Sequence, residues 1–161
     1  MDIRNWSLDQ IMQLPDSVFG NRFLVSVQSH IGAAGTVWDI SEIPFPERFV
    51  IWELHVSVSR VGVENVWCRI AFGDQLPTTT AQMDGLEPVF NGLGMQGAGP
   101  RQIFVTSLTP IILTRLKIPK QATGRRLVSE FGGTGPGAGY CTVSMVVSSI
   151  PREIPDCLIS V

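Results

Sequence analysis

The sequence predicts an all-β protein, an antiparallel β-sandwich or jelly roll of about eight strands with a short N-terminal helix. Three observations support this fold class. From residue 21 onward, apolar and polar side chains alternate with a period of two, as they do in half-buried strands. Turn-forming glycine, proline and asparagine separate these segments. After residue 20 no helical pattern is long enough for a crossover connection, so neighbouring strands should run antiparallel.

The first twenty residues are predicted to form an arm, and residues 21–161 are predicted to form the sandwich domain. Ser7 and Gln10 have the spacing of a capping box, apolar residues follow at helical spacing, and Pro15 ends the pattern. A helix of two turns is unstable on its own. It must therefore pack either on its own domain or on a neighbouring subunit, and the sequence leaves both open.

Residues 48–60 form the clearest strand. One face of it is expected to hold Val50, Trp52, Leu54, Val56 and Val58. Residues 66–72 follow after a short link that contains glycine, and the two segments together indicate one long hairpin.

Residues 73–100 are rich in turn-forming residues, and a loop of this length is typically functional or interfacial, with room for a short strand or helix. Further strand patterns cover residues 101–107, 110–118, 126–131, 140–150 and 157–161. In residues 140–150 the apolar face consists of Cys141, Val143, Met145 and Val147.

Charged residues are scarce and unevenly chosen. They make up 16% of the chain, against about 25% in an ordinary soluble domain. Ten of the twelve basic residues are arginine. Protein interfaces are enriched in arginine and aromatic residues and depleted in lysine and glutamate. A GC-rich genome would also favour arginine, but it would raise alanine too, and alanine occurs only seven times. The composition therefore predicts a subunit that buries much of its surface against neighbours.

No residue pattern predicts catalysis. His30 and His55 are isolated, and no Gly-x-Ser-x-Gly elbow is present. The glycine-rich residues 132–139 precede a strand and lack the Lys-Ser/Thr ending of a phosphate loop. The cysteines lack CxxC spacing, which favours buried thiols in a reducing compartment. The sequence thus predicts no catalytic residue, no metal ligand and no cofactor.

The residues expected to contact partners lie near the arm, the tail and the one basic cluster, apart from Trp67 in the strand pattern of residues 66–72. They are Arg4, Trp6, Arg22, Trp67, Arg125, Arg126 and Arg152. A net charge of -2 argues against direct contact with nucleic acid. No apolar run reaches the roughly 18 residues of a membrane helix. The first residues lack the apolar core of a signal peptide, so secretion by that route is not expected.

Residues 118–126, 132–139 and 140–149 combine a proline- and glycine-rich connection, a glycine-rich turn and a long apolar strand. With the low charge and the arm, this texture over residues 21–161 resembles virion structural proteins of the jelly-roll or β-sandwich kind, including head-decoration and tail components of tailed bacteriophages. The resemblance assigns no site residue.

The resemblance implies a non-enzymatic structural subunit of a large symmetric assembly, most simply a virion assembled in the host cytoplasm. Its partners would be copies of itself and other structural subunits, reached through the arm, residues 73–100 and the tail at residues 151–161. Deletion of residues 1–20 is then expected to leave a folded domain that no longer assembles.

Two alternatives belong to other functional classes. A carbohydrate-binding β-sandwich module would expose Trp38 or Trp67 on a concave face and bind glycan there. A β-barrel enzyme would need two convergent carboxylates in a cleft.

Overall fold

A computed structural model describes residues 1–31, 35–41, 46–60, 66–89, 103–105, 111–122, 126–133 and 139–158. The described part is built mainly from strands, and the predicted all-β class is confirmed. Its strands are β1 (Phe23–Ile31), β2 (Gly35–Ser41), β3 (Arg48–Arg60), β4 (Val66–Gly73), β5 (Glu87–Pro88), β6 (Ile103–Val105), β7 (Ile111–Leu113), β8 (Ile118–Gln121), β9 (Arg126–Gly133) and β10 (Gly139–Ser149). Its helices are α1 (Leu8–Met12), α2 (Thr80–Asp84) and two 3-10 turns, η1 (Asp16–Val18) and η2 (Asp156–Leu158).

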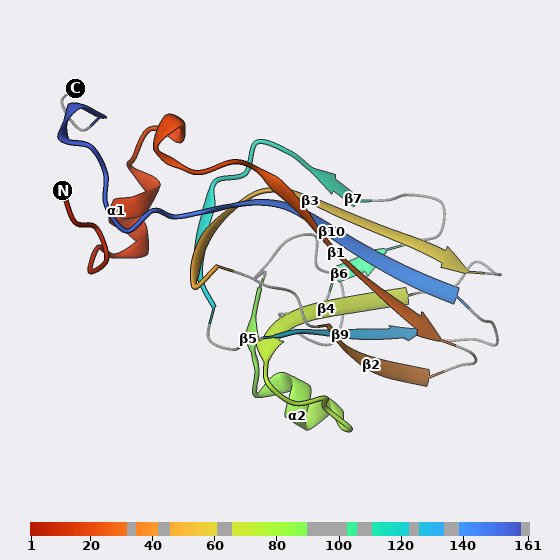
Figure 1. The fold of residues 1–161 in the computed structure, drawn as a ribbon. Coiled ribbons are helices and arrows are strands. Elements are labelled where there is room, and N and C mark those ends of the chain that lie inside the picture. The colour runs from red at the N-terminus through yellow and green to blue at the C-terminus, as the bar shows by residue number, and fades with distance from the viewer. Residues whose placement is uncertain are drawn as a thin grey trace.

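The strands form two antiparallel sheets that lie one above the other (Figure 1). The first sheet has the order β1-β10-β3-β7, with β8 also paired to β3. The second has the order β2-β9-β4-β5, with β6 also paired to β4. The short strands β7 and β8 pair with successive parts of β3 opposite β10, and β5 and β6 do the same for β4. Each sheet therefore has four strand positions, which matches the predicted total.

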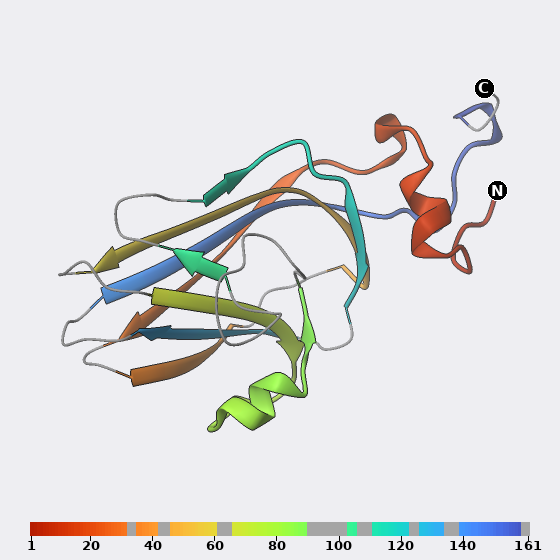
Figure 2. The same cartoon turned by 180° about the vertical axis from the view of Figure 1, so that it is seen from behind.

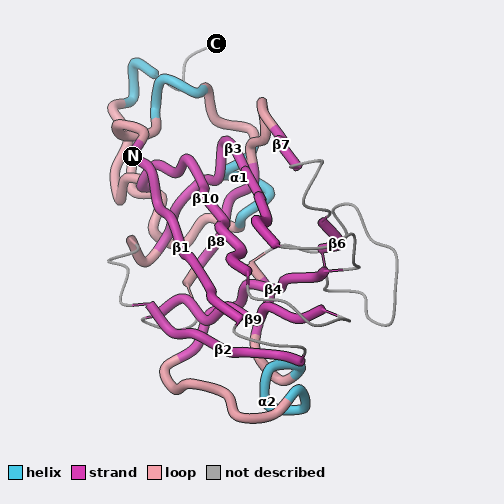
Figure 3. Tube along the Cα trace, turned by 90° about the vertical axis from the view of Figure 1, so that its right-hand side faces the viewer, coloured by secondary structure: helices cyan, strands magenta, loops and turns pink. Residues whose placement is uncertain are grey.

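Most strands that follow one another in the chain lie in opposite sheets, as the end-on view in Figure 3 shows for β1 and β2 and for β3 and β4. The exceptions are β4, β5 and β6, which share the second sheet, and β7 and β8, which share the first. This order is that of a jelly roll. The predicted hairpin of residues 48–60 and 66–72 is wrong, because β10 occupies one edge of β3 and β7 and β8 occupy the other. Periodicity could not reveal this, since a hairpin and a crossing between sheets both turn alternate side chains inward.

The main core fills the space between the sheets. The predicted inward face of residues 140–150 is confirmed, and residues 68, 70 and 72 of β4 face it from the opposite sheet. This core contains Val25, Val27, Phe49, Ile51, Leu54, Val56, Cys68, Ile70, Phe72, Val89, Leu127, Phe131, Cys141, Val143, Met145 and Val147.

A β-bulge interrupts the pairing of β3 with β10. Val147 pairs with Ile51 and Val146 pairs with Glu53, so Trp52 is an extra residue on β3. An extra residue reverses which face the following side chains occupy.

Because of the bulge, the prediction that Val50, Trp52 and Leu54 share one face of β3 is wrong. Ile51 and Leu54 both face the main core, whereas Val50 and Trp52 face away from it. Both faces of the strand are therefore apolar at this end of the sheet, and the outer one needs a cover.

The N-terminal arm and the tail supply that cover. Side chains from both join Val50, Trp52 and Ile150 in a second buried cluster, which we call the arm cluster: Ile3, Ile11, Leu14, Phe19, Val50, Trp52, Ile150 and Ile154. Of the two packing modes left open by the sequence, the helix adopts the first and packs on its own domain. Figure 2 shows α1, the N-terminus and the last described residues of the tail together at one end of the sandwich.

Backbone hydrogen bonds tie the two ends of the described chain together. The Ile3 amide donates to the Arg152 carbonyl at 2.9 Å, and the Ile154 amide donates to the Met1 carbonyl at 2.9 Å. The predicted capping box of α1 is present, with Ser7 and Gln10 each bonding the other's backbone amide.

On the second sheet, the side that faces away from the main core is partly covered by α2, where Met83 packs on Ala71 and Val128. A buried ion pair joins Arg69 of β4 to Glu130 of β9, and Arg69 also contacts Asp84. Burial by itself would lower the pKa of Arg69, but the bonds to the two carboxylates raise it.

Two strand predictions need correction. The pattern over residues 110–118 is broken into β7 and β8 by Arg115, whose φ of 58° lies in the left-handed region. Residues 156–158 form η2 instead of a strand, with the Leu158 amide bonded to the Pro155 carbonyl at 3.0 Å. Residues 159–161 lie outside the described part.

Candidate functional site

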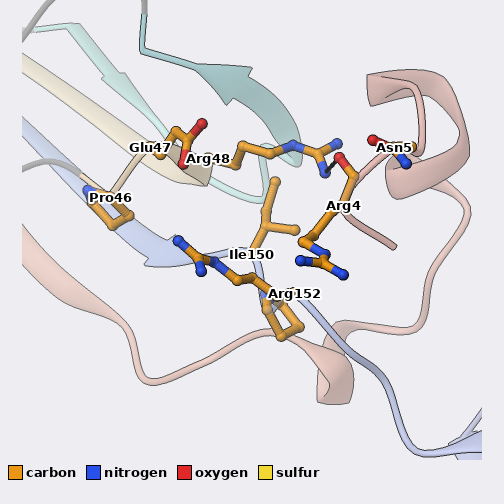
Figure 4. Close-up of a pocket in the computed structure, with 8 residues that line it drawn as sticks. Arg4, Asn5, Pro46, Glu47, Arg48, Ile150 and Arg152 are labelled. Atoms are coloured by element: carbon orange, nitrogen blue, oxygen red, sulfur yellow. Dashed lines mark hydrogen bonds between the residues drawn. The ribbon is translucent and has the colours of Figure 1, made fainter. Parts of the chain in front are cut away.

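Two of the predicted contact residues meet at the junction of arm and tail. Arg4 and Arg152 line a cavity of about 560 Å³ together with Arg48, the first residue of β3 (Figure 4). The three guanidinium groups come from segments far apart in the sequence. Glu47 also lines the cavity, so its charge is mixed but predominantly positive.

Arg48 holds the arm in place. Its Nη1 donates to the carbonyls of Ile3 at 2.9 Å and Arg4 at 3.0 Å, and its Nη2 donates to the carbonyl of Trp6 at 2.6 Å. Sequence reasoning did not select Arg48, because nothing in a strand pattern shows that a guanidinium will bind a distant backbone. Its role is structural, and the other two guanidinium groups of this cavity belong to Arg4 and Arg152.

Arg4 is paired with Asp2. Its Nε and Nη2 bond both oxygens of the carboxylate at 2.5–3.1 Å, and the Arg4 amide bonds it at 2.9 Å. The side-chain bond, followed by the backbone bond, lowers the pKa of Asp2 to about 2. Arg152 is exposed and makes no side-chain hydrogen bond to a described residue.

Arg22 and Trp6 both contact the arm cluster. The Arg22 guanidinium sits 4.2 Å from the centre of the Trp52 ring, a cation–π contact. Trp6 is half-buried and packs against the cluster. The Trp52 indole nitrogen donates to Ser148 Oγ at 2.7 Å, which satisfies its one donor inside the protein.

The remaining candidates belong to the second sheet. Trp67 of β4 pairs in register with Gly132 of β9, but its side chain lies outside the described part. Arg126 begins β9 and is half-buried, and Arg125 lies outside the described residues. The structure thus brings Arg4 and Arg152 together and places Trp67 and Arg126 elsewhere.

A feature missed by sequence reasoning is the outward side of the first sheet, which we call the outer face. Its described side chains are Leu24, Ser26, Gln28, Glu53, His55, Ser57, Ile112, Tyr140, Thr142 and Ser144. Hydroxyl and amide groups bond across the strands, as between Ser26 and Ser144 at 2.8 Å. Its exposed apolar residues are Leu24 at 67%, Ile112 at 58% and Tyr140 at 47%.

The outer face carries almost no charge. Within the set just named, the acidic and basic side chains are Glu53 and His55, which contact each other at 3.1 Å. The signal for this surface was present in the sequence as serine, threonine and glutamine alternating with core residues. Its meaning depends on knowing that three strands place those residues side by side.

Metal sites and membrane-spanning helices can be checked directly in the described ranges. No three histidine, cysteine, aspartate or glutamate side chains there gather to hold a metal ion. None of the helices of that same part is long and apolar enough to cross a membrane. Comparison with protein-family models and with curated proteins finds no match to this chain.

Proposed function

We propose that this protein is a non-enzymatic structural subunit of a large symmetric assembly, a virion component whose partners are copies of itself and other structural subunits. The observation that supports this best is the outer face. It is broad, exposed and nearly free of charge, yet Leu24, Ile112 and Tyr140 project apolar surface from it. In the strand register these three side chains are separated by polar residues such as Ser144 and His55, so the support comes from the scarcity of charge over a broad exposed face and not from a contiguous apolar patch.

The chemistry of the outer face suits contact with another subunit. Burying a hydroxyl or amide costs little when the group already has a hydrogen-bond partner, and Ser26, Gln28, Thr142 and Ser144 have such partners across the strands. Burying unpaired lysine or glutamate would cost far more. The outer face brings few like charges against a second copy of itself, because its acidic side chain, Glu53, lies beside His55 at 3.1 Å.

The jelly-roll strand order adds support from fold analogy. Jelly rolls are used in viral capsids, and also in lectins and cupins, so the fold does not by itself select a function. The low charge, the arginine bias and the outer face favour the first of these.

Light scattering of the purified protein across a concentration series, with electron microscopy of the products, tests the proposal. Wild type should form particles or oligomers well above 17.6 kDa. Leu24→Lys and Ile112→Lys, which put a charge on the outer face, should assemble much more weakly. Leu76→Lys is the matched control. Leu76 is also an exposed leucine, at 47%, but it follows β4, a strand of the second sheet, and so lies away from the outer face.

Equal assembly by all the variants would overturn the role given to the outer face. A stable monomer that binds immobilised glycan would instead favour the carbohydrate-binding alternative. Deletion of residues 1–20 is a poor test, because it also removes half of the arm cluster.

A further inference from the structure

A second cavity, of about 580 Å³, lies beside the bulge of β3. Its two arginines donate no hydrogen bond to a described residue. Arg22 and Arg115 both line it, above a floor that includes Trp52. We propose that this cavity binds a carboxylate between the two guanidinium groups and that, in the assembly, an acidic side chain of a second copy supplies it. The second part rests on the proposed function; the first does not.

Arg22 is positioned for such a ligand by its stacking on Trp52. Trp52 is 4% exposed and is held by its bond to Ser148, so the surface under the guanidinium is rigid. A stacked guanidinium keeps its N–H edge available for a planar acceptor. Arg22 donates no hydrogen bond to any described residue.

Arg115 is held at the cavity by an uncommon backbone conformation. A φ of 58° is rare for residues other than glycine and asparagine, and such residues concentrate at functional sites. The next residue anchors the turn, since the Leu116 amide donates to the Trp52 carbonyl at 3.0 Å. Arg115 is exposed and, within the described part of the chain, its guanidinium has no acceptor.

The charge of the lining favours a carboxylate. Arg22, Arg115 and Lys117 contribute three positive charges and Asp16 and Glu53 two negative ones, which leaves +1. Lys117 is already paired with Asp16 at 2.8 Å, and Glu53 contacts His55. One monoanion would neutralise the cavity, whereas a phosphate dianion would leave it negative beside two carboxylates. Arginine also binds the planar carboxylate through two parallel hydrogen bonds.

The same chain can supply this partner. It has fourteen acidic residues against twelve basic ones. Exposed carboxylates such as Glu87 and Glu153 make no ion pair with another described residue. A lysine-poor subunit that pairs arginine with carboxylate across its contacts would account for the arginine bias of the composition.

The binding test uses the blocked peptide acetyl-Gly-Glu-Gly-amide on the full chain, followed by NMR of the Trp52 indole N–H, which a Trp52→Phe variant assigns. We expect a saturable shift with a dissociation constant in the millimolar range, as for a single carboxylate. Arg22→Gln and Arg115→Gln should each weaken binding about tenfold, whereas Arg152→Gln, which removes an exposed arginine outside this cavity, should not change it.

Three results would each overturn the site: no saturable shift, an equal shift with the uncharged control peptide acetyl-Gly-Gln-Gly-amide, or tighter binding of inorganic phosphate than of acetyl-Gly-Glu-Gly-amide.

The source of the carboxylate is tested separately by light scattering. The double variant Arg22→Gln/Arg115→Gln should assemble at least tenfold less readily than wild type. If it binds no peptide yet assembles normally, the neighbouring-subunit part is wrong while the proposed function stands. If wild type binds the peptide but stays monomeric, the proposed function and the neighbouring-subunit part both fail and the carboxylate site remains.

Discussion

Replacement of Ile11 by alanine should destabilise the entire sandwich, although Ile11 lies in an arm that precedes the first strand. Its side chain is completely buried in the arm cluster, whose other half is Val50, Trp52, Ile150 and Ile154 of the domain. If the arm folds together with the domain, the cavity left by the substitution weakens the domain itself. If the arm packs only on a neighbouring subunit, the isolated protein should not respond.

The size of the effect follows from the burial. The substitution removes roughly three buried methyl or methylene groups at about 0.8 kcal/mol each, or about 2.4 kcal/mol. A residual cavity adds to this, and substitutions of this kind usually cost about 2–5 kcal/mol. We therefore expect the free energy of unfolding of Ile11→Ala to fall by about 3 kcal/mol.

Urea denaturation followed by tryptophan fluorescence measures this change, because Trp52 lies in the same cluster. The matched control is Met12→Ala in the same helix, where the side chain is 47% exposed and the expected change is within about 0.5 kcal/mol. The denaturant dependence of the unfolding free energy should be the same in both variants. Equal stability of the two would refute cooperative packing of the arm.

Two further predictions concern titratable groups. NMR titration should give Asp2 a pKa of about 2, and Arg4→Ala should return this pKa toward the ordinary value of 3.8. Because the folded-state pKa of Asp2 is lowered, the Asp2–Arg4 contact should be complete above pH 3.8 and be lost as the pH falls through about 2. In native protein, DTNB should modify the exposed Cys157 rapidly but not the buried Cys68 and Cys141. The hydrogen bond between Cys68 and Cys141, followed by burial, raises the pKa of Cys68 well above its ordinary value, so rapid modification of Cys68 before unfolding would contradict the described packing.

Local patterns predicted the features that depend on neighbours in sequence. The capping box at Ser7 and Gln10 is present as predicted, because its two hydrogen bonds span only three residues. The inward face of residues 141–147 is also correct, since a strand without an extra residue keeps its alternation over its whole length. The number of strand positions followed from the turn-forming segments between them.

Features that depend on pairing were not predicted. The alternation of β3 gave no sign of the bulge at Trp52, because the faces are assigned by the register with β10, nearly a hundred residues away. For the same reason β3 and β4 were expected to pair, although they lie in different sheets. The outer face and the cavity beside Arg22 likewise exist only after distant strands have been placed side by side.

The sequence by itself determined the fold class, the sparse charge and the excess of arginine over lysine, because composition and periodicity are local properties. The tertiary structure decided where the arm and the tail lie. It packs the arm and the tail against each other and against the first sheet, so that Arg4 and Arg152 share one cavity and Arg22 stacks on the displaced Trp52. The physical reason is the bulge, which turns Val50 and Trp52 away from the main core and creates an apolar surface that the two ends of the chain bury.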